Sequence, residues 1–182
     1  MKVKFYTLGC KVNQYESQAM AERLQKHGFE ITGDKSADVF VVNSCTVTAS
    51  ADQKTRQAVR RFKRNNPGSI VILTGCMPQA YPEKSNELIE ADIVLGNKNN
   101  ALLPDLLLQY QADGKRIFNV CEHRKGDPFS GDTISGFEER TRAYLKIQDG
   151  CNRFCSYCVI PYSRGRVRSK PLDEIKNEVE VL

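Results

Sequence analysis

The feature that most constrains the fold is a set of short apolar runs that recur along the first two thirds of the chain. Three of them, at residues 39–42, 70–73 and 93–95, are almost uninterrupted. Such runs are typical of strands buried on both faces of a parallel sheet. Helical periodicity lies between them, so we expect an α/β domain with an open, mostly parallel five-stranded sheet and flanking helices. The expected strands are Val3–Leu8, Asp38–Asn43, Ser69–Thr74, Asp92–Leu95 and Arg116–Val120.

The segments between these strands carry helix signals. Asn13, with Glu16 three residues later, predicts the cap of a helix that Gly28 ends. Ser50 with Gln53 has the spacing of a capping box for the next helix. Two further helices are expected over Pro82–Glu90 and Asn100–Gln111.

The chain changes character after residue 120. Residues 121–140 are rich in glycine, proline and aspartate without sustained periodicity, which indicates a linker between domain 1–120 and a second unit at 141–182. That unit should open with an alternating strand, Ala143–Ile147, and Pro171 should start a helix. The sequence leaves open whether this unit docks on the first domain, stays mobile or pairs with another copy, and it leaves the oligomeric state open.

Cysteine content and hydropathy limit the function classes. No apolar run approaches the roughly 18 residues of a membrane span, and the chain starts without the apolar core of a signal peptide. We therefore expect a cytoplasmic protein with no membrane partner. Seven cysteines in a reducing compartment favour metal ligands or catalytic thiols over disulfides.

Three cysteines follow three of the expected strands. Cys10, Cys45 and Cys76 each come after a strand and a small residue. The carboxyl ends of parallel strands share one edge of a sheet, where ligands bind, so these thiols should meet in space. Converging thiolates suit a soft metal or an iron–sulfur cluster. The alternative is that small cysteines simply pack near strand ends.

A second set of cysteines is compact. Cys151, Cys155 and Cys158 lie within eight residues, in a C-x3-C-x2-C pattern. Three thiolates on one loop can hold a [4Fe–4S] cluster and leave one iron open. The aromatic Tyr157 could flank a ligand there. The alternative, zinc, needs a fourth ligand such as Cys121 or His123; otherwise we expect Cys121 to be a bystander thiol and His123 to be exposed.

The net charge of +5 comes from 27 basic and 22 acidic residues, unevenly distributed. Residues 53–82 and 150–172 contain no acidic residue. An acidic body with two cationic stretches suggests a nucleic-acid partner, although solvated helix faces would give the same pattern. The candidate RNA contacts are Lys54, Arg56, Arg60, Arg61, Arg64, Arg164, Arg166 and Arg168.

The cysteine loop resembles the signature of radical S-adenosylmethionine (SAM) enzymes. Together with the segments at residues 8–17, 43–47 and 74–76, it resembles the radical-SAM methylthiotransferases over residues 2–168. The resemblance implies a transferase with two [4Fe–4S] clusters. One, held by Cys151, Cys155 and Cys158, would bind SAM and cleave it reductively; the other, held by Cys10, Cys45 and Cys76, would be tied to sulfur delivery.

The resemblance also implies a substrate and partners. Residues 9–17 look most like the branch that 2-methylthiolates N6-threonylcarbamoyladenosine beside the tRNA anticodon, and an electron donor would reduce the clusters. Sister branches act on isopentenyladenosine in tRNA or on a ribosomal-protein aspartate. A full radical-SAM barrel should extend beyond residue 182, so we expect this chain to be a fragment, inactive by itself, that ends after the first βα unit of the barrel. A non-enzymatic iron–sulfur sensor that binds RNA is a further alternative.

Overall fold

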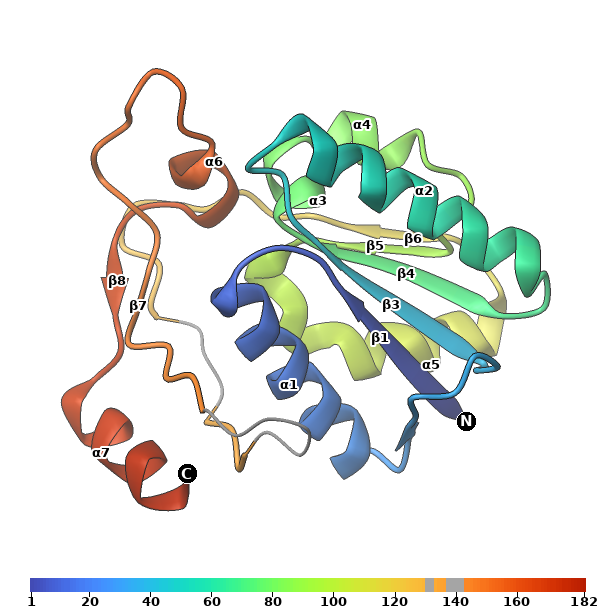
Figure 1. The fold of residues 1–182 in the computed structure, drawn as a ribbon, viewed down its shortest axis with the longest axis horizontal. Coiled ribbons are helices and arrows are strands. Elements are labelled where there is room, and N and C mark those ends of the chain that lie inside the picture. Colours follow the sequence, from blue (N-terminus) through green and yellow to red (C-terminus); the bar gives the residue numbers. More distant parts are fainter. Residues whose placement is uncertain (130–132, 137–142) are drawn as a thin grey trace.

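The computed structural model describes residues 1–129, 133–136 and 143–182 (Figure 1). Its main feature is a six-stranded, entirely parallel sheet with the strand order β2-β1-β3-β4-β5-β6. The strands are β1 (Lys2–Thr7), β2 (Glu30–Ile31), β3 (Val39–Ser44), β4 (Ile70–Gly75), β5 (Ile93–Leu95) and β6 (Ile117–Asn119). The predicted α/β class and all five expected strands are confirmed. The two-residue edge strand β2 is too short to leave a hydropathy signal.

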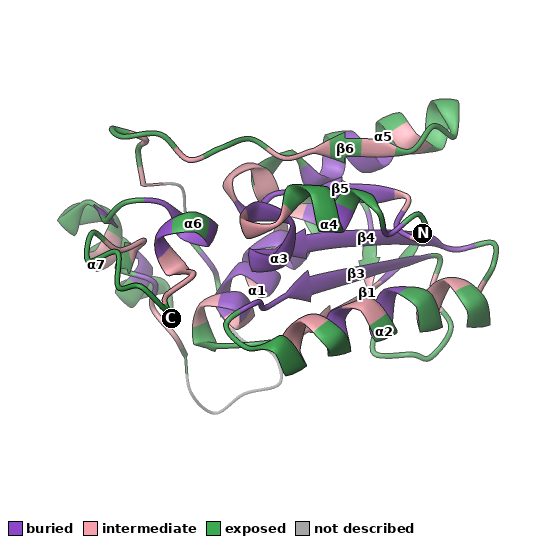
Figure 2. Ribbon diagram, turned by 90° about the horizontal axis from the view of Figure 1, so that it is seen from above, coloured by how far each residue is buried: buried purple, intermediate pink, exposed green. Residues whose placement is uncertain are grey.

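Helices cover both faces of this sheet. On one face α1 (Lys11–Lys26) and α5 (Leu103–Asp113) pack, and on the other lie α2 (Ala49–Asn65), α3 (Cys76–Ala80) and α4 (Pro82–Asn86) (Figure 1). A short 3-10 helix, η1 (Asn97–Leu102), precedes α5. The central strands β3 and β4 are buried throughout (Figure 2). Their near-continuous apolar sequence therefore reflects a core on each side of the sheet.

Two of the predicted helix caps are wrong. Cys10, rather than Asn13, is the residue before α1, and Asn13 lies in the first turn. Thr48, rather than Ser50, caps α2, with its side chain accepting a hydrogen bond from the Ala51 amide at 3.1 Å. Both errors have one cause: several cap-compatible residues follow one another, and only the backbone conformation selects one.

The C-terminal segment is built differently from the prediction. A short ribbon pairs β7 (Gln148–Asp149) with β8 (Arg168–Ser169) in antiparallel fashion, with the cysteine loop and α6 (Ile160–Arg164) between them and α7 (Leu172–Val181) after them. The predicted strand Ala143–Ile147 is wrong, because the strand β7 lies at Gln148–Asp149 instead. That this segment is the first βα unit of a radical-SAM barrel stays a prediction. Ile147, the apolar last residue of that predicted strand, is 52% exposed, whereas Lys146 is buried in ion pairs.

This segment packs against α1 through buried polar contacts. The carboxylate of Glu178 in α7 is fully buried, accepts a hydrogen bond from the Tyr15 hydroxyl of α1 at 2.6 Å, and pairs with Lys170. The amide of Ile134 donates to the same carboxylate at 3.1 Å. The predicted linker thus contributes a contact of its own; residues 130–132 and 137–142 of it lie outside the described residues. In the described part of the chain, no helix combines the length and apolar character of a membrane span.

Candidate functional site

The carboxyl edge of the sheet collects the first three cysteines. Cys10 follows β1, Cys45 follows β3 and Cys76 begins α3 directly after β4. These strands are neighbours in the sheet, with the pairs Thr7–Asn43 and Ser44–Gly75 in register at their ends. Three strands that are far apart in sequence therefore deliver three thiols to adjacent positions on one edge.

A glycine permits close approach within this edge. Gly9 has a φ of 107°, and a β-carbon built on it would lie 2.6 Å from Cys45 Cβ and 3.0 Å from Cys45 Sγ. Any other residue here would clash with Cys45 and adopt a strained backbone conformation. Gly9 thus lets the turn that carries Cys10 lie directly against Cys45.

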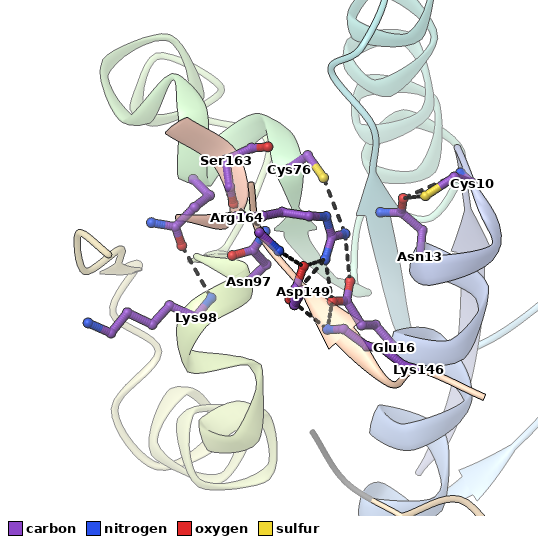
Figure 3. A network of polar contacts seen from close by, with 12 residues as sticks. Cys10, Asn13, Glu16, Cys76, Asn97, Lys98, Lys146, Asp149, Ser163 and Arg164 are labelled. Carbon is purple, nitrogen blue, oxygen red and sulfur yellow. Dashed lines mark hydrogen bonds and ion pairs between the residues drawn. The ribbon is translucent and has the colours of Figure 1, made fainter. Parts of the chain in front are cut away.

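Two asparagines hold the turns that bear these cysteines. The Asn13 side-chain amide donates to the Ser44 carbonyl oxygen at 3.0 Å and to Asn43 Oδ1 at 3.1 Å, and the Asn43 amide donates to the Asn13 carbonyl oxygen at 2.9 Å. Asn13 Oδ1 also lies 3.2 Å from Cys10 Sγ (Figure 3). The sequence motif contains both asparagines, but it gives no sign that they hold two turns together.

A buried ion-pair network lies beside Cys76 (Figure 3). Arg164 from α6 donates to both carboxylate oxygens of Glu16 in α1, at 2.6 and 3.0 Å, and lies 3.4 Å from Asp149. Lys146 pairs with Glu16 and Asp149, each at 2.8 Å. Arg164 Nη2 also donates to Cys76 Sγ at 3.4 Å. One guanidinium therefore joins a sheet-edge cysteine to the segment that carries the second cysteine set.

Burial and charge have opposing effects in this network. Burial by itself would raise the pKa of Glu16, but the adjacent Arg164 and Lys146 outweigh it and lower this pKa from 4.5 to about 2. Burial also raises the pKa of the Cys76 thiol, against the opposing effect of Arg164. Glu16, Lys146 and Asp149 were not among the predicted site residues. The one sequence feature that could have indicated this network is Lys146, a charged residue within an apolar stretch.

The second cysteine set lies on an accessible loop. Cys155 is exposed, and Cys151 and Cys158 are partly exposed. Between them Phe154 adopts a φ of 48°, which is uncommon for a residue other than glycine, and the Arg166 guanidinium lies 5.1 Å from its ring centre. The ends of the loop are joined by the hydrogen bond from the Cys151 amide to the Gly165 carbonyl oxygen, at 3.0 Å. Tyr157 is 90% exposed.

The two predicted basic stretches have different environments. On α2, Lys54, Arg60, Arg61 and Arg64 are exposed and Arg56 is partly exposed. In the second stretch Arg166 is exposed, whereas Arg164 is 4% and Arg168 is 9% exposed. These two arginines are buried beside carboxylates, with which they form ion pairs inside the protein. The prediction that they contact RNA is therefore wrong.

The two histidines and Cys121 lie outside both sets of three cysteines. The prediction that His123 is exposed is wrong. Its side chain is 7% exposed, and its ring nitrogens lie 3.1 Å from Asn97 Oδ1 and 3.2 Å from Arg168 Nη1. Burial, together with the positive charge of Arg168, lowers its pKa from 6.5 to about 4. Cys121 is exposed, and His27 ends α1.

The donor chemistry at the sheet edge fits a soft metal or cluster. Three thiols follow three adjacent strand ends, and Gly9 leaves the space that a side chain would fill. As the side chains stand, no three His, Cys, Asp or Glu residues within the described ranges converge closely enough to hold an ion. The placement of the backbone therefore suits such a group, and binding would require the thiols to turn toward one another.

Comparison with known proteins decides the family. A family model described as "uncharacterized protein family UPF0004" matches residues 2–96, which include β1 to β5 and the first three cysteines. The chain belongs to this family. This region contains the complete set of sheet-edge cysteines.

The curated relatives of this chain include proteins named as tRNA methylthiotransferases and proteins named as synthases of a 2-methylthio nucleoside in tRNA. The chain is 41% identical to the threonylcarbamoyladenosine tRNA methylthiotransferase MtaB of Aquifex aeolicus, over 100% of this chain and 45% of that protein. The Bacillus subtilis protein of the same name is 38% identical, over 99% of this chain and 40% of that protein. A tRNA-2-methylthio-N(6)-dimethylallyladenosine synthase of Finegoldia magna is 34% identical, over 96% and 39%. The predicted resemblance to methylthiotransferases is thus confirmed, and the chain spans less than half the length of these relatives.

Proposed function

We propose that this chain serves a tRNA methylthiotransferase that converts N6-threonylcarbamoyladenosine, next to the anticodon, into its 2-methylthio form. The observation that carries the proposal is the similarity to proteins with that name, which extends over essentially the whole chain and therefore includes both cysteine sets. The sheet edge supports it independently, because three neighbouring strands place Cys10, Cys45 and Cys76 at its carboxyl end.

Two [4Fe–4S] clusters and SAM are the cofactors of this proposal. Cys151, Cys155 and Cys158 would hold the cluster that binds SAM, with Tyr157 beside it, and the sheet-edge cysteines would hold the other. When bound, these groups supply the one-electron chemistry that inserts sulfur at an unreactive carbon. The chain's own residues supply ligands, orientation and protection from water.

The buried network has a defined part in this proposal. Arg164 fixes α6, which follows the cysteine loop, against α1 and against Cys76. Its positive charge stabilises a thiolate at Cys76, where burial alone disfavours ionisation. Glu16 and Asp149 hold the guanidinium in place. The network therefore orients the two cysteine sets relative to each other.

The remaining parts of the proposal concern partners and location. The substrate is a tRNA, an electron donor reduces the clusters, and the protein acts in the cytoplasm. The exposed arginines of α2, with Lys54 and Arg166, contact RNA phosphates, which position the RNA without reading its sequence. We also propose that residues 1–120 and 141–182 belong to different domains, joined by 121–140.

A second candidate substrate is N6-dimethylallyladenosine in tRNA. The observation that favours it is the 32–34% identity to several synthases of its 2-methylthio derivative. The identities to the threonylcarbamoyladenosine enzymes reach 41%, so we place that substrate first.

The substrate assignment is tested by nucleoside mass spectrometry. We expect tRNA from a strain that lacks the gene to lose 2-methylthio-N6-threonylcarbamoyladenosine, and to regain it when the intact gene is returned but not when the gene encodes Cys45→Ala. Loss of the dimethylallyl derivative instead would select the second candidate. Unchanged amounts of both nucleosides would contradict the proposed function.

A further inference from the structure

A pocket of about 530 Å³ lies on the α2 side of the sheet, outside the cysteine edge. Lys4 and Tyr6 of β1 alternate onto this face, and Phe40 pairs with Lys4 in the sheet register. The main strand contacts of α2 are with β3 and β4. The adjoining part of β1 is therefore left as a recess, lined on the helix side by Arg61 and Phe62.

The recess has an aromatic floor. The Phe40 and Phe62 rings stack with their centres 4.6 Å apart and an angle of 15° between their planes. Tyr6 meets Phe62 edge-on at 5.5 Å. The Arg61 guanidinium lies 5.5 Å from the centre of the Tyr6 ring and 5.1 Å from that of Phe62. A planar cation thus covers the aromatic cluster and faces the solvent with its other side.

The rim of the recess is cationic. Lys4, Lys35 and Arg61 line it, and no Asp or Glu does. The Lys4 ammonium is held by the carbonyl oxygens of Gly33 and Asp34, each at 2.6 Å, which keep its charge at the site without neutralising it. Within the described ranges no carboxylate pairs with Arg61, whereas the adjacent Arg60 lies 3.2 Å from Glu90.

Flat rings and a guanidinium plane bind nucleobases by stacking, and uncompensated cations bind the phosphates next to them. We propose that this recess binds a nucleotide of single-stranded RNA, with its base stacked on the Arg61 guanidinium, which Tyr6 and Phe62 support from below, and its phosphates near Lys35 and Lys4. This inference rests on the proposed tRNA substrate and names a place where that RNA is held.

The recess lies away from the proposed chemistry. The helix α2 begins four residues after Cys45 and runs for 17 residues, about 25 Å at 1.5 Å per residue. Arg61 and Phe62 are in its last turns, so the recess is at the opposite end from the cysteines. It therefore serves to dock RNA and not to carry the reaction.

Binding of a short oligouridylate, followed by fluorescence anisotropy, tests the proposal. Arg61→Ala should weaken binding about tenfold, the size expected for one lost stacking contact, and Arg61→Lys should recover only part of it because it restores charge without a plane. Arg124→Ala is the matched control, since it removes the same charge from an exposed arginine outside both basic stretches and outside the recess, and its effect should be at most about twofold.

A second arm removes the base in place of the side chain. The wild-type protein should bind an oligonucleotide of abasic residues about tenfold more weakly than the normal strand. Arg61→Ala should weaken the binding of this abasic strand little further, because both changes delete the same stacking contact. Tyr6→Leu, with folding checked by circular dichroism, should behave like Arg61→Ala. Equal affinities of Arg61→Ala and Arg124→Ala, or equal binding of abasic and normal strands, would overturn the proposal.

The binding experiment and the nucleoside analysis can fail independently of each other. If the tRNA nucleosides are unchanged in the deletion strain while the stacking pattern is seen, the recess stands and the modification assignment falls. If the nucleoside is lost while Arg61→Ala binds normally, the recess alone falls.

Discussion

Two regions of the molecule combine three cysteines with a basic stretch, and they do so in opposite ways. At the sheet edge, Cys45 and Cys76 are buried and the basic stretch on α2 is exposed. In the C-terminal segment the cysteines lie on an accessible loop, and two arginines of the basic stretch are buried in ion pairs. Similar runs of cationic sequence therefore serve as a solvent-facing surface in one place and as part of the core in the other.

The difference lies in distant acidic residues. Neither stretch contains an acidic residue of its own, but Glu16 and Asp149 lie beside Arg164 in the folded chain. Within the part of the chain that the structure describes, only some of the basic residues on α2 form ion pairs, namely Lys63 with Asp92 and Arg60 with Glu90. A count of local charge thus cannot separate an RNA-binding surface from an internal network, and the comparison can be tested by substitution.

The largest expected effect is at Arg164. Arg164→Gln should lower the free energy of unfolding by about 3–5 kcal/mol, because it leaves Glu16 and Asp149 buried with less compensating charge. Chemical denaturation measures this change. The matched control is Arg166→Gln in the same stretch, where the exposed side chain should contribute no more than about 0.5 kcal/mol. Equal losses in the two variants would contradict the difference in environment.

The next effect is a pH dependence centred on His123. Its pKa is about 4 in the folded chain, against an ordinary 6.5, so the unfolded chain binds more protons between these values. Stability should therefore fall by about 2–3 kcal/mol as the pH is lowered from 7 to 4. The side chain faces Arg168, Lys98, Asp127 and Asp149.

His123→Gln should remove this step from a plot of unfolding free energy against pH. Asp127, whose pKa is lowered from 3.8 mainly by Lys98, would add a loss only at more acidic pH. A step between pH 4 and 7 that survives His123→Gln would assign the effect to another group.

A smaller effect is expected at the start of α2, the helix that carries the exposed stretch. Thr48→Ala should cost about 1 kcal/mol, because the Ala51 amide loses the acceptor that caps the helix. Ser50→Ala is the control, since Ser50 is exposed inside the first turn and should change stability little. Thermal unfolding of both variants decides between the two caps, and the reverse order would restore Ser50 as the capping residue.

The smallest effect on stability is expected along α2 itself. Arg64→Gln should leave the unfolding free energy within about 0.5 kcal/mol of wild type, because its side chain is solvent-facing. If the same arginine contacts a phosphate, the dependence of RNA affinity on salt should become shallower by about one unit of logarithmic slope. A large loss of stability with an unchanged slope would place Arg64 among the internal charges.

The sequence predicted the parts that depend on local pattern. Buried strands such as Val39–Ser44 are legible in hydropathy, and the positions of Cys10, Cys45 and Cys76 after strands place them at one edge by the rules of parallel sheets. The network around Arg164 was not predictable, because it joins Glu16 to residues more than a hundred positions away. The alternating pattern at Ala143–Ile147 wrongly predicted a strand there. Ion pairs bury Lys146 and leave Ile147 exposed, so they outweigh the apolar pattern.

We propose that the cysteines form two separate cluster sites, one at the edge of the sheet and one on the C-terminal loop. Anaerobic reconstitution with iron and sulfide, followed by iron analysis, tests it most directly. We expect about eight irons per chain in wild type. About four should remain when alanine replaces either Cys10, Cys45 and Cys76 or Cys151, Cys155 and Cys158. Stoichiometric zinc in place of iron, or an iron content unchanged by the sheet-edge substitutions, would contradict it.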